Sequence, residues 1–177
     1  MLTPKTLRSL GRAFSRRLQE KAQVYDMLAK NNERPKQRRA QWIGQQAQLP
    51  WITNDLKKHC GKRSPVVDPL GVVSNLGDPR RTDVLALVAG ETVQFELKKS
   101  DYGGERVSSQ LSAQVFDLGL GTRGASSLVV IYGETGRIEV YTREDAKEAV
   151  DAVLNKKLSF QIPAPAAVID FRPGIDE

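Results

Sequence analysis

The stretch that decides the fold is DPRRTDVLALVAGETVQFELKKS, residues 78–100. Two apolar, β-branched runs, 81–88 and 92–99, flank an Ala-Gly-Glu sequence, and this pattern predicts a β-hairpin. A two-residue loop at Gly90 and Glu91 would pair Asp83 with Lys98 and Leu85 with Glu96. A four-residue loop keeps the same parity, whereas a three-residue loop would split the apolar residues between the two faces of the hairpin.

In this register the hairpin has one polar and one apolar face. Opposed residues of an antiparallel pair share a face, as do residues two apart on one strand. Asp83, Glu96 and Lys98 therefore project together. The opposite face is continuous and apolar, formed by Val84, Ala86, Val88, Val93, Phe95 and Leu97.

The polar face has the chemistry of a metal-dependent phosphodiesterase. Magnesium prefers hard oxygen ligands, here the carboxylates of Asp83 and Glu96 with a backbone carbonyl (that of Leu97) and waters. A bound metal ion lowers the pKa of a water and neutralises charge on a phosphodiester, and Lys98 would orient that water or the phosphate. The alternative interpretation is a solvated ladder of ion pairs across an exposed hairpin.

The elements around the hairpin indicate a mixed α/β fold. Helical spacing of apolar residues predicts helices over 4–30 and from Pro35 to about Leu49, ended by Pro50. A short helical stretch is expected around 51–59. Beyond the hairpin we expect a helix over 108–118, strands over 128–132 and 137–141, a helix over 143–154 capped by Thr142, and an extended piece over 167–171. The domain prediction is a basic helical N-terminal arm or subdomain, 1–60, and a catalytic core, 61–177.

Positive charge is concentrated in the first forty residues. They carry eleven lysines and arginines against three acidic residues, a net +8 in a chain whose total is +6. Such a segment suits a polyanion, most often nucleic acid, because each phosphate contact releases counterions; a solvated helix face fits the charge equally well. The predicted DNA-binding residues are Arg12, Arg16, Arg17, Arg38 and Arg39 of the arm, with Arg80 and Arg81 before the hairpin.

Composition excludes several classes of protein. No apolar run reaches the roughly 18–20 residues of a membrane span, and the first residues lack a secretory signal, so we expect a cytoplasmic protein of bacterial, archaeal or phage origin. Cys60 is the only cysteine and His59 the only histidine, so the pair is expected to be incidental. Residues 119–124 match GxGxxG but follow a helix rather than a strand, which argues against a nucleotide cofactor.

The segments RTDVLALV and TVQFELKKS resemble the core of the PD-(D/E)XK nuclease superfamily, which includes type II restriction endonucleases and Holliday-junction resolvases. Asp83 matches the motif aspartate, Glu96 its acidic position and Lys98 its lysine, although Thr82 replaces the literal proline. The resemblance extends to about Leu154, and residues 128–150 resemble the closing strands and helix of small restriction enzymes.

The resemblance implies a restriction endonuclease-like core with a central mixed sheet flanked by helices. It implies a Mg²⁺-dependent DNA endonuclease, with Mn²⁺ as a substitute, of the small type II restriction type; a junction resolvase and a homing-type endonuclease stay open. It also implies a homodimer, for which the helix over 4–30 could supply the surface. Ser100, Gln110 and Gln114 fall where the family places supporting polar residues, with Gln114 preferred. A further acid could come from Glu20, Asp26, Glu33 or Asp55. The alternative from another class is a non-catalytic nucleic-acid-binding module.

Overall fold

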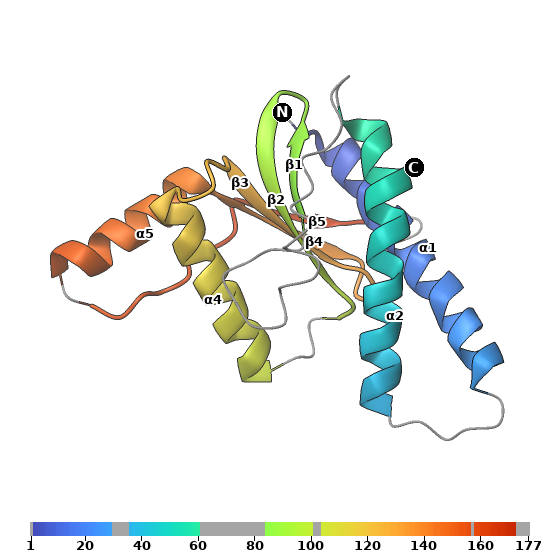
Figure 1. The fold of residues 1–177 in the computed structure, drawn as a ribbon. Coiled ribbons are helices and arrows are strands. Elements are labelled where there is room, and N and C mark those ends of the chain that lie inside the picture. Colours follow the sequence, from blue (N-terminus) through green and yellow to red (C-terminus); the bar gives the residue numbers. More distant parts are fainter. Residues whose placement is uncertain (1, 30–35, 61–83, 101–103, 157, 173–177) are drawn as a thin grey trace.

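The computed structural model describes residues 2–29, 36–60, 84–100, 104–156 and 158–172. Its strands form one five-stranded sheet in the order β1-β2-β3-β4-β5, with helices on both faces (Figure 1). The strands are β1 (Val84–Val88), β2 (Glu91–Lys98), β3 (Ser127–Tyr132), β4 (Arg137–Thr142) and β5 (Ala167–Asp170). The prediction of a mixed α/β fold with a central mixed sheet is therefore confirmed.

The sheet is antiparallel except at its centre, where β2 and β3 run parallel. A parallel pair needs a long crossover connection, and the helix α4 (Gly104–Leu120) provides it. The helix α5 (Arg143–Lys156) follows β4, and Thr142 accepts a hydrogen bond from the backbone of Asp145, as expected of its N-cap. Both α4 and α5 lie on one side of the sheet (Figure 1).

The other side of the sheet is covered by α1 (Pro4–Leu28) and α2 (Lys36–Pro50) (Figure 1). Thr3 caps α1 by accepting a hydrogen bond from the backbone of Thr6, and Pro4 occupies the first turn, where its missing N–H costs nothing. The apolar stripe of α1 packs into one core with the apolar face of the hairpin. That core contains Leu7, Leu10, Phe14, Leu18, Trp51, Val84, Ala86, Val88, Val93, Phe95 and Leu97.

This core confirms the predicted apolar face of the hairpin. It also joins the N-terminal helices to the sheet, since Trp51 lies between Phe14 and Phe95, with ring centroids 6.3 and 5.5 Å apart. The indole nitrogen of Trp51 donates a hydrogen bond of 2.9 Å to the carbonyl of Leu10. A boundary near residue 60 stays a prediction, but residues on both sides of it share a core.

The helical conformation does not stop at Pro50, as the sequence suggested it would. Pro50 has φ −62° and ψ −31°, and the chain continues through a π-helical turn, η1 (Trp51–Asp55), and a 3₁₀ turn, η2 (Leu56–His59). A proline lacks the N–H needed for an α-helical bond but accepts helical dihedrals. The expected short helix over 51–59 therefore continues directly from α2.

The hairpin turn lies one residue earlier than predicted. Val88 pairs with Glu91 and Leu85 pairs with Gln94, so the two loop residues are Ala89 and Gly90 rather than Gly90 and Glu91. Both loop residues have positive φ, 51° and 83°, which is typical of the type I′ turn that matches strand twist. The shift moves the pairing by two residues, so the predicted faces are preserved although the predicted partners of Leu85 and Glu96 were wrong.

Candidate functional site

Glu96 and Lys98 lie on the face of the sheet that α4 covers. Lys98 Nζ is 3.0 Å from Glu96 Oε1, and it donates a hydrogen bond of 2.5 Å to Gln110 Oε1 on α4. Strand alternation explains why both side chains emerge on the same face, two residues apart on β2. The packing of α4 against that face brings the amide of Gln110 to the ammonium group. The three residues form the Glu96–Lys98–Gln110 cluster.

The cluster is not the solvated ladder that was the alternative prediction. The side chains of Glu96 and Lys98 are only 4% and 14% exposed. Gln94, two residues before Glu96 on the same face, is 1% exposed, and its Oε1 receives no hydrogen bond from the described residues. Burying charges costs several kcal/mol per ion unless the partners are well arranged. A buried carboxylate, a partly buried ammonium group and an unsatisfied amide oxygen on one strand are unusual for an interior.

A second polar cluster on the same face could not be seen in the sequence. Register places Glu139 of β4 opposite Val130, which lies beside Glu96. Arg137 contacts Glu139 at 3.1 Å, and the hydroxyl of Tyr141 donates a hydrogen bond to the same carboxylate. Burial and this hydrogen bond raise the pKa of Tyr141 well above its usual value. Alternation along β4 was the available signal, but only the strand order shows that Glu139 and Glu96 share a face.

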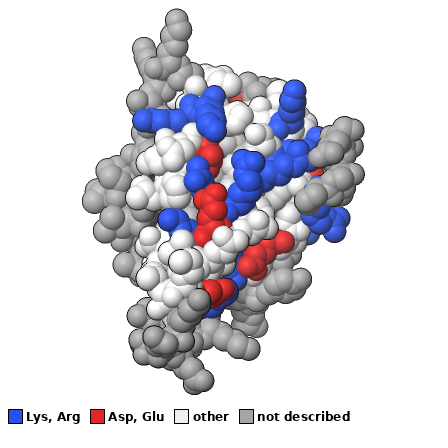
Figure 2. All heavy atoms as spheres, turned by 90° about the vertical axis from the view of Figure 1, so that its right-hand side faces the viewer, with Lys and Arg blue, Asp and Glu red and all other residues white. Residues whose placement is uncertain are grey.

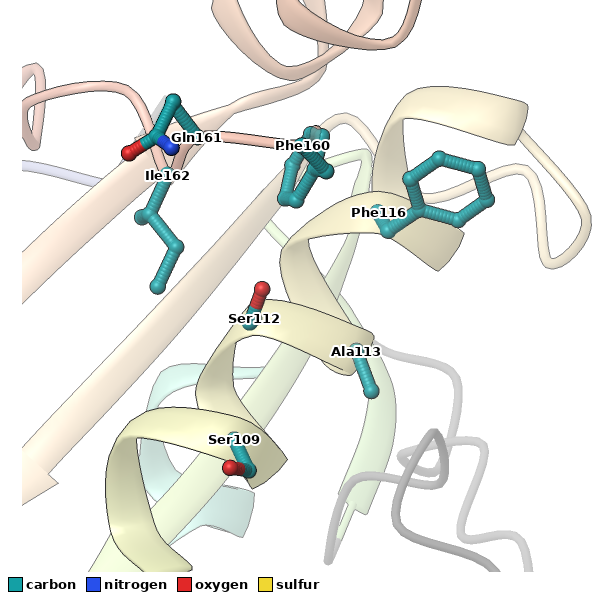
Figure 3. A pocket seen from close by; sticks show the side chains of 7 residues that line it. All are labelled: Ser109, Ser112, Ala113, Phe116, Phe160, Gln161 and Ile162. Carbon is teal, nitrogen blue, oxygen red and sulfur yellow. The ribbon is translucent and has the colours of Figure 1, made fainter. Parts of the chain in front are cut away.

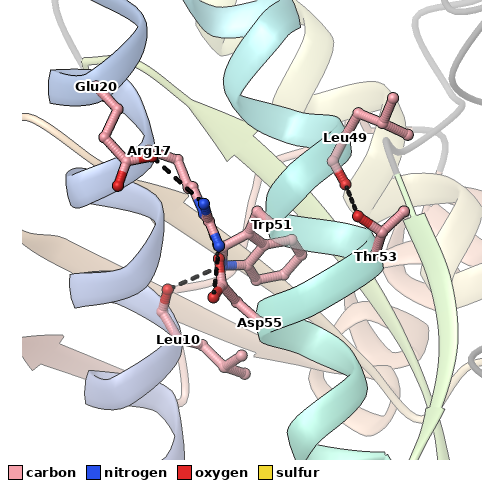
Figure 4. Close-up of polar contacts among 7 residues, drawn as sticks. All are labelled: Leu10, Arg17, Glu20, Leu49, Trp51, Thr53 and Asp55. Carbon is pink, nitrogen blue, oxygen red and sulfur yellow. Dashed lines mark hydrogen bonds and ion pairs between the residues drawn. The ribbon is translucent and has the colours of Figure 1, made fainter.

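The acidic residues proposed from the N-terminal helices are used in ion pairs on the other side of the sheet. Arg17 of α1 donates two hydrogen bonds to Asp55, at 2.9 and 3.3 Å, and one to Glu20 at 3.3 Å (Figure 4). Arg39 makes a similar fork to Asp26, at 3.1 Å for both bonds.

These contacts also change the electrostatics of the two arginines. The hydrogen bonds to Asp55 and to Asp26 raise the pKa of Arg17 and of Arg39, respectively. The fork between Arg17 and Asp55 joins α1 to η1, with Asp55 itself only 6% exposed. Two of the predicted DNA-binding arginines, Arg17 and Arg39, thus hold the helical layer together.

The remaining predicted arginines of this layer lie at the surface. Arg16 and Arg38 are exposed, and Arg12 is half-buried with its Nε 3.4 Å from the carbonyl of Phe171. Lysine and arginine side chains gather on the face that α1 and α2 present, with acidic side chains between them (Figure 2).

Three predicted residues, Asp83, Arg80 and Arg81, lie outside the described residues, as does Glu33. Among the described candidates, Leu97 occupies β2 between Glu96 and Lys98. Its side chain is buried on the opposite face of the sheet, in the core that the hairpin shares with α1.

The supporting residues differ in their surroundings. Ser100 is half-buried just after β2, and Gln114 lies one turn beyond Gln110 on α4, where it is 1% exposed. Gln110 is the glutamine whose amide oxygen accepts the hydrogen bond from Lys98. Helical spacing placed both glutamines on one side of α4, but the sequence could not show which one meets the lysine.

A cavity of about 720 Å³ lies on the outer side of α4. Ser109, Ser112 and Phe116 line it from the helix, and Phe160 and Ile162 from the segment before β5 (Figure 3). No charged side chain lines it among the described residues, and Glu96 and Lys98 are not part of it. In the described part of its lining, two serine hydroxyls and the amide of Gln161 are the polar groups, and the rest is apolar.

Gly119 and Leu120 still belong to α4, and the connection to β3 begins at Gly121, so the predicted helix-to-strand loop starts two residues later than expected. Gly121 and Gly124 adopt positive φ there, 73° and 66°.

Burial raises the pKa of the Cys60 thiol. In the described part of the chain, no cluster of three or more histidines, cysteines or carboxylates could hold a metal ion. Nor does any helix in that part have the length and apolar character to cross a membrane.

Comparisons with protein-family models, with curated proteins and with solved structures found no match to this chain.

Proposed function

We propose that this chain is a magnesium-dependent DNA endonuclease of the small restriction type, with Glu96 and Lys98 in its active site and Asp83 as the second carboxylate. The observation that carries the proposal is the low exposure of the Glu96–Lys98 pair, 4% and 14%, together with the contact of Lys98 to Gln110 of α4. Buried ion pairs contribute little to stability relative to apolar residues of the same size. Functional sites are where buried charged groups with specific partners are concentrated in protein structures.

The neighbouring polar groups support a site rather than a structural ion pair. Gln110 holds Lys98 from α4, so the ammonium group has two fixed contacts. A lysine restrained in this way can hold a phosphate oxygen or a water without reorganising, which is the condition for strong electrostatic stabilisation. Gln94 adds a buried amide oxygen two residues before Glu96 on the same face.

The proposal requires the β1–β2 pairing to continue by one residue beyond Val84, which pairs with Phe95. Asp83 would then be opposite Glu96, and the two carboxylates would share a face. Because Asp83 lies outside the described residues, this step rests on the sequence and on the register of its neighbours.

The donor set fits magnesium better than other common metals. Magnesium is held by one or two carboxylates with several waters and substrate phosphates, whereas zinc and copper sites use histidine and cysteine. Glu96 and Asp83 would hold the ion, with the amide oxygen of Gln94 on the same face. When bound, magnesium would supply Lewis acidity toward the phosphodiester and a more acidic water. Lys98 would hold a phosphate oxygen, and Gln110 would fix the position of Lys98.

The test is incubation of the full chain with plasmid, linear duplex and four-way junction DNA, with Mg²⁺ or with EDTA. Cleavage of plasmid and linear duplex with Mg²⁺ alone is expected, whereas selective cleavage of the junction would indicate a resolvase. Asp83→Asn and Glu96→Gln should abolish cleavage and keep DNA binding. Glu91→Gln, the same change at the opposite end of β2, is the matched control and should cleave normally.

Binding without cleavage of any of the three substrates would contradict the proposal and favour a non-catalytic nucleic-acid-binding module. Cleavage by Glu96→Gln at the wild-type rate would remove Glu96 from the site.

A further inference from the structure

A basic pocket of about 370 Å³ lies between α1 and the β3–β4 turn. Three arginines line it: Arg12 and Arg16 from α1, and Arg172 from the segment after β5. Ser15 and Gln19 add neutral polar groups from α1. No acidic side chain lines the pocket among the described residues.

The described charged groups that line the pocket are all arginines. The carboxylate of Asp170 contacts Arg172 at 2.5 Å, so one of the three lining guanidinium groups is held by an acidic partner. Arg8 adds a further guanidinium group, since its Nε donates to the backbone carbonyl of Asp170 at 3.2 Å. The hydrogen bond from Arg172 holds the pKa of Asp170 below its usual value, so this carboxylate stays ionised and fixes Arg172.

The glycines of the β3–β4 turn give the pocket its shape. Gly136 has φ +78°, and a Cβ there would be 2.5 Å from the side chain of Arg172. A Cβ on Gly133 would be 2.4 Å from Leu18 of α1. Any side chain at either position would push α1 or Arg172 away, so the absence of side chains lets the arginines approach the turn.

The turn is attached to the end of the strand that carries the Glu96–Lys98–Gln110 cluster. The backbone of Gly133 donates to the carbonyl of Lys98 at 2.9 Å, and that of Glu134 donates to Lys99 at 2.8 Å. The pocket and the cluster therefore lie at the same end of the sheet, with the pocket on the α1 side and the cluster on the α4 side. A nucleic-acid strand that passes over this end could contact both.

We propose that this pocket binds a backbone phosphate of the DNA, a phosphodiester that is not the one cleaved. The inference rests on the proposed function for its ligand, DNA, and adds a second contact that fixes the strand relative to Glu96. Guanidinium groups match the oxygens of a phosphate in geometry and charge. A phosphate held away from the reacting bond fixes the position of the duplex without reading its sequence.

The test compares Arg16→Ala with Lys5→Ala, an exposed lysine of the same helix that does not line the pocket. Both variants are made in the Glu96→Gln background, and binding to a labelled duplex is measured in EDTA between about 50 and 200 mM salt. Loss of one phosphate contact should lower the slope of log K against log salt by about 0.9. Arg16→Ala should show this loss together with weaker binding, Arg16→Lys should recover most of both, and Lys5→Ala should show neither.

A direct probe is titration of the full chain with inorganic phosphate, followed by the NMR shifts of the Gly133 and Gly136 amides. Shifts that saturate, and that Arg16→Ala weakens, support the pocket. An Arg16→Ala slope equal to that of Lys5→Ala overturns the proposal, and saturable phosphate shifts with an unchanged slope would mean a site for free phosphate instead. Binding is measured without cleavage. If Arg16→Ala lowers the salt slope in a chain that never cleaves DNA, the result supports the phosphate pocket and contradicts only the proposed nuclease activity.

Discussion

Replacement of Lys98 tests the burial of the cluster and its chemistry at once. Lys98→Met keeps the length of the side chain and removes its charge, so the carboxylate of Glu96, 4% exposed, loses a partner at 3.0 Å. Loss of one partner from a buried ion pair costs about 3–5 kcal/mol. An exposed pair would cost about 0–1 kcal/mol. Domains of this size have about 5–15 kcal/mol of stability in total, so the variant should still fold at 25 °C.

The measurement is urea unfolding in EDTA for Lys98→Met, Glu96→Gln and the double variant. Since the double variant leaves no uncompensated charge, its cost should be smaller than the sum of the two single costs, by about 1–3 kcal/mol. The matched control is Lys99→Met. Lys99 pairs with Glu134 at 2.8 Å, where the side chains are 25% and 49% exposed, and its loss should cost less than about 1 kcal/mol.

Catalysis is measured separately by single-turnover cleavage with Mg²⁺ under conditions where each variant is folded. Lys98→Met should cleave about 10²–10³ times more slowly, roughly 3–4 kcal/mol in the barrier, and Lys99→Met almost normally. The argument from burial would be refuted if Lys98→Met and Glu96→Gln each changed the free energy of unfolding by almost nothing and their effects simply added in the double variant. A folded Lys98→Met protein that cleaves at the wild-type rate would refute the chemical role of Lys98 while leaving the structural argument intact.

Three further predictions concern stability. Ala89 occupies positive φ, 51°, before Gly90, so Ala89→Asn should raise the free energy of unfolding by about 0.5–1 kcal/mol; a loss of stability in urea would contradict the type I′ turn. Asp55→Ala removes the buried acceptor of the Arg17 hydrogen bonds and should lower the free energy of unfolding by about 1.5–3 kcal/mol. Asp26→Ala removes the more exposed acceptor of Arg39 and should cost less than about 1 kcal/mol. Equal shifts of the two urea midpoints would show that burial does not strengthen the contact between Arg17 and Asp55. The raised pKa of Tyr141 means that the unfolded chain loses this proton first, so its contribution is complete below about pH 10 and falls at higher pH. Tyr141→Phe should therefore flatten the loss of stability between about pH 9.5 and 11, and an unchanged pH profile in guanidinium unfolding would count against the raised pKa that burial and the hydrogen bond to Glu139 cause.

The periodicity of the chain determined most of its elements. The predicted helix over 4–30 ends at Leu28, that over 108–118 extends over Gly104–Leu120, and that over 143–154 reaches Lys156. Both closing strands and the extended piece near residue 170 were expected within a residue or two. Apolar spacing identifies an element because one face must be buried, but its ends depend on caps and on packing, which spacing does not report.

The turn of the hairpin shows where local reasoning stops. The sequence Ala-Gly-Glu allows a two-residue loop at either of two positions, and both keep the same apolar face buried. The pairing of Val88 with Glu91 selects the loop at Ala89, which has to adopt positive φ. An energetically unfavourable residue in the turn is accepted because the rest of β2 is fixed by its pairing with β3.

Sequence alone determined that Glu96 and Lys98 share a face of one strand, since the side-chain period of a strand is two. Whether that face is open or covered is decided by segments far away along the chain. Only the tertiary structure shows that the pair is largely covered and that α4 brings Gln110 to Lys98, and only the strand order places Glu139 on the same face. The pocket formed by Arg16 and Arg172 has the same origin, because long-range contacts between α1 and the chain after β5 bring together charges that neither segment holds alone.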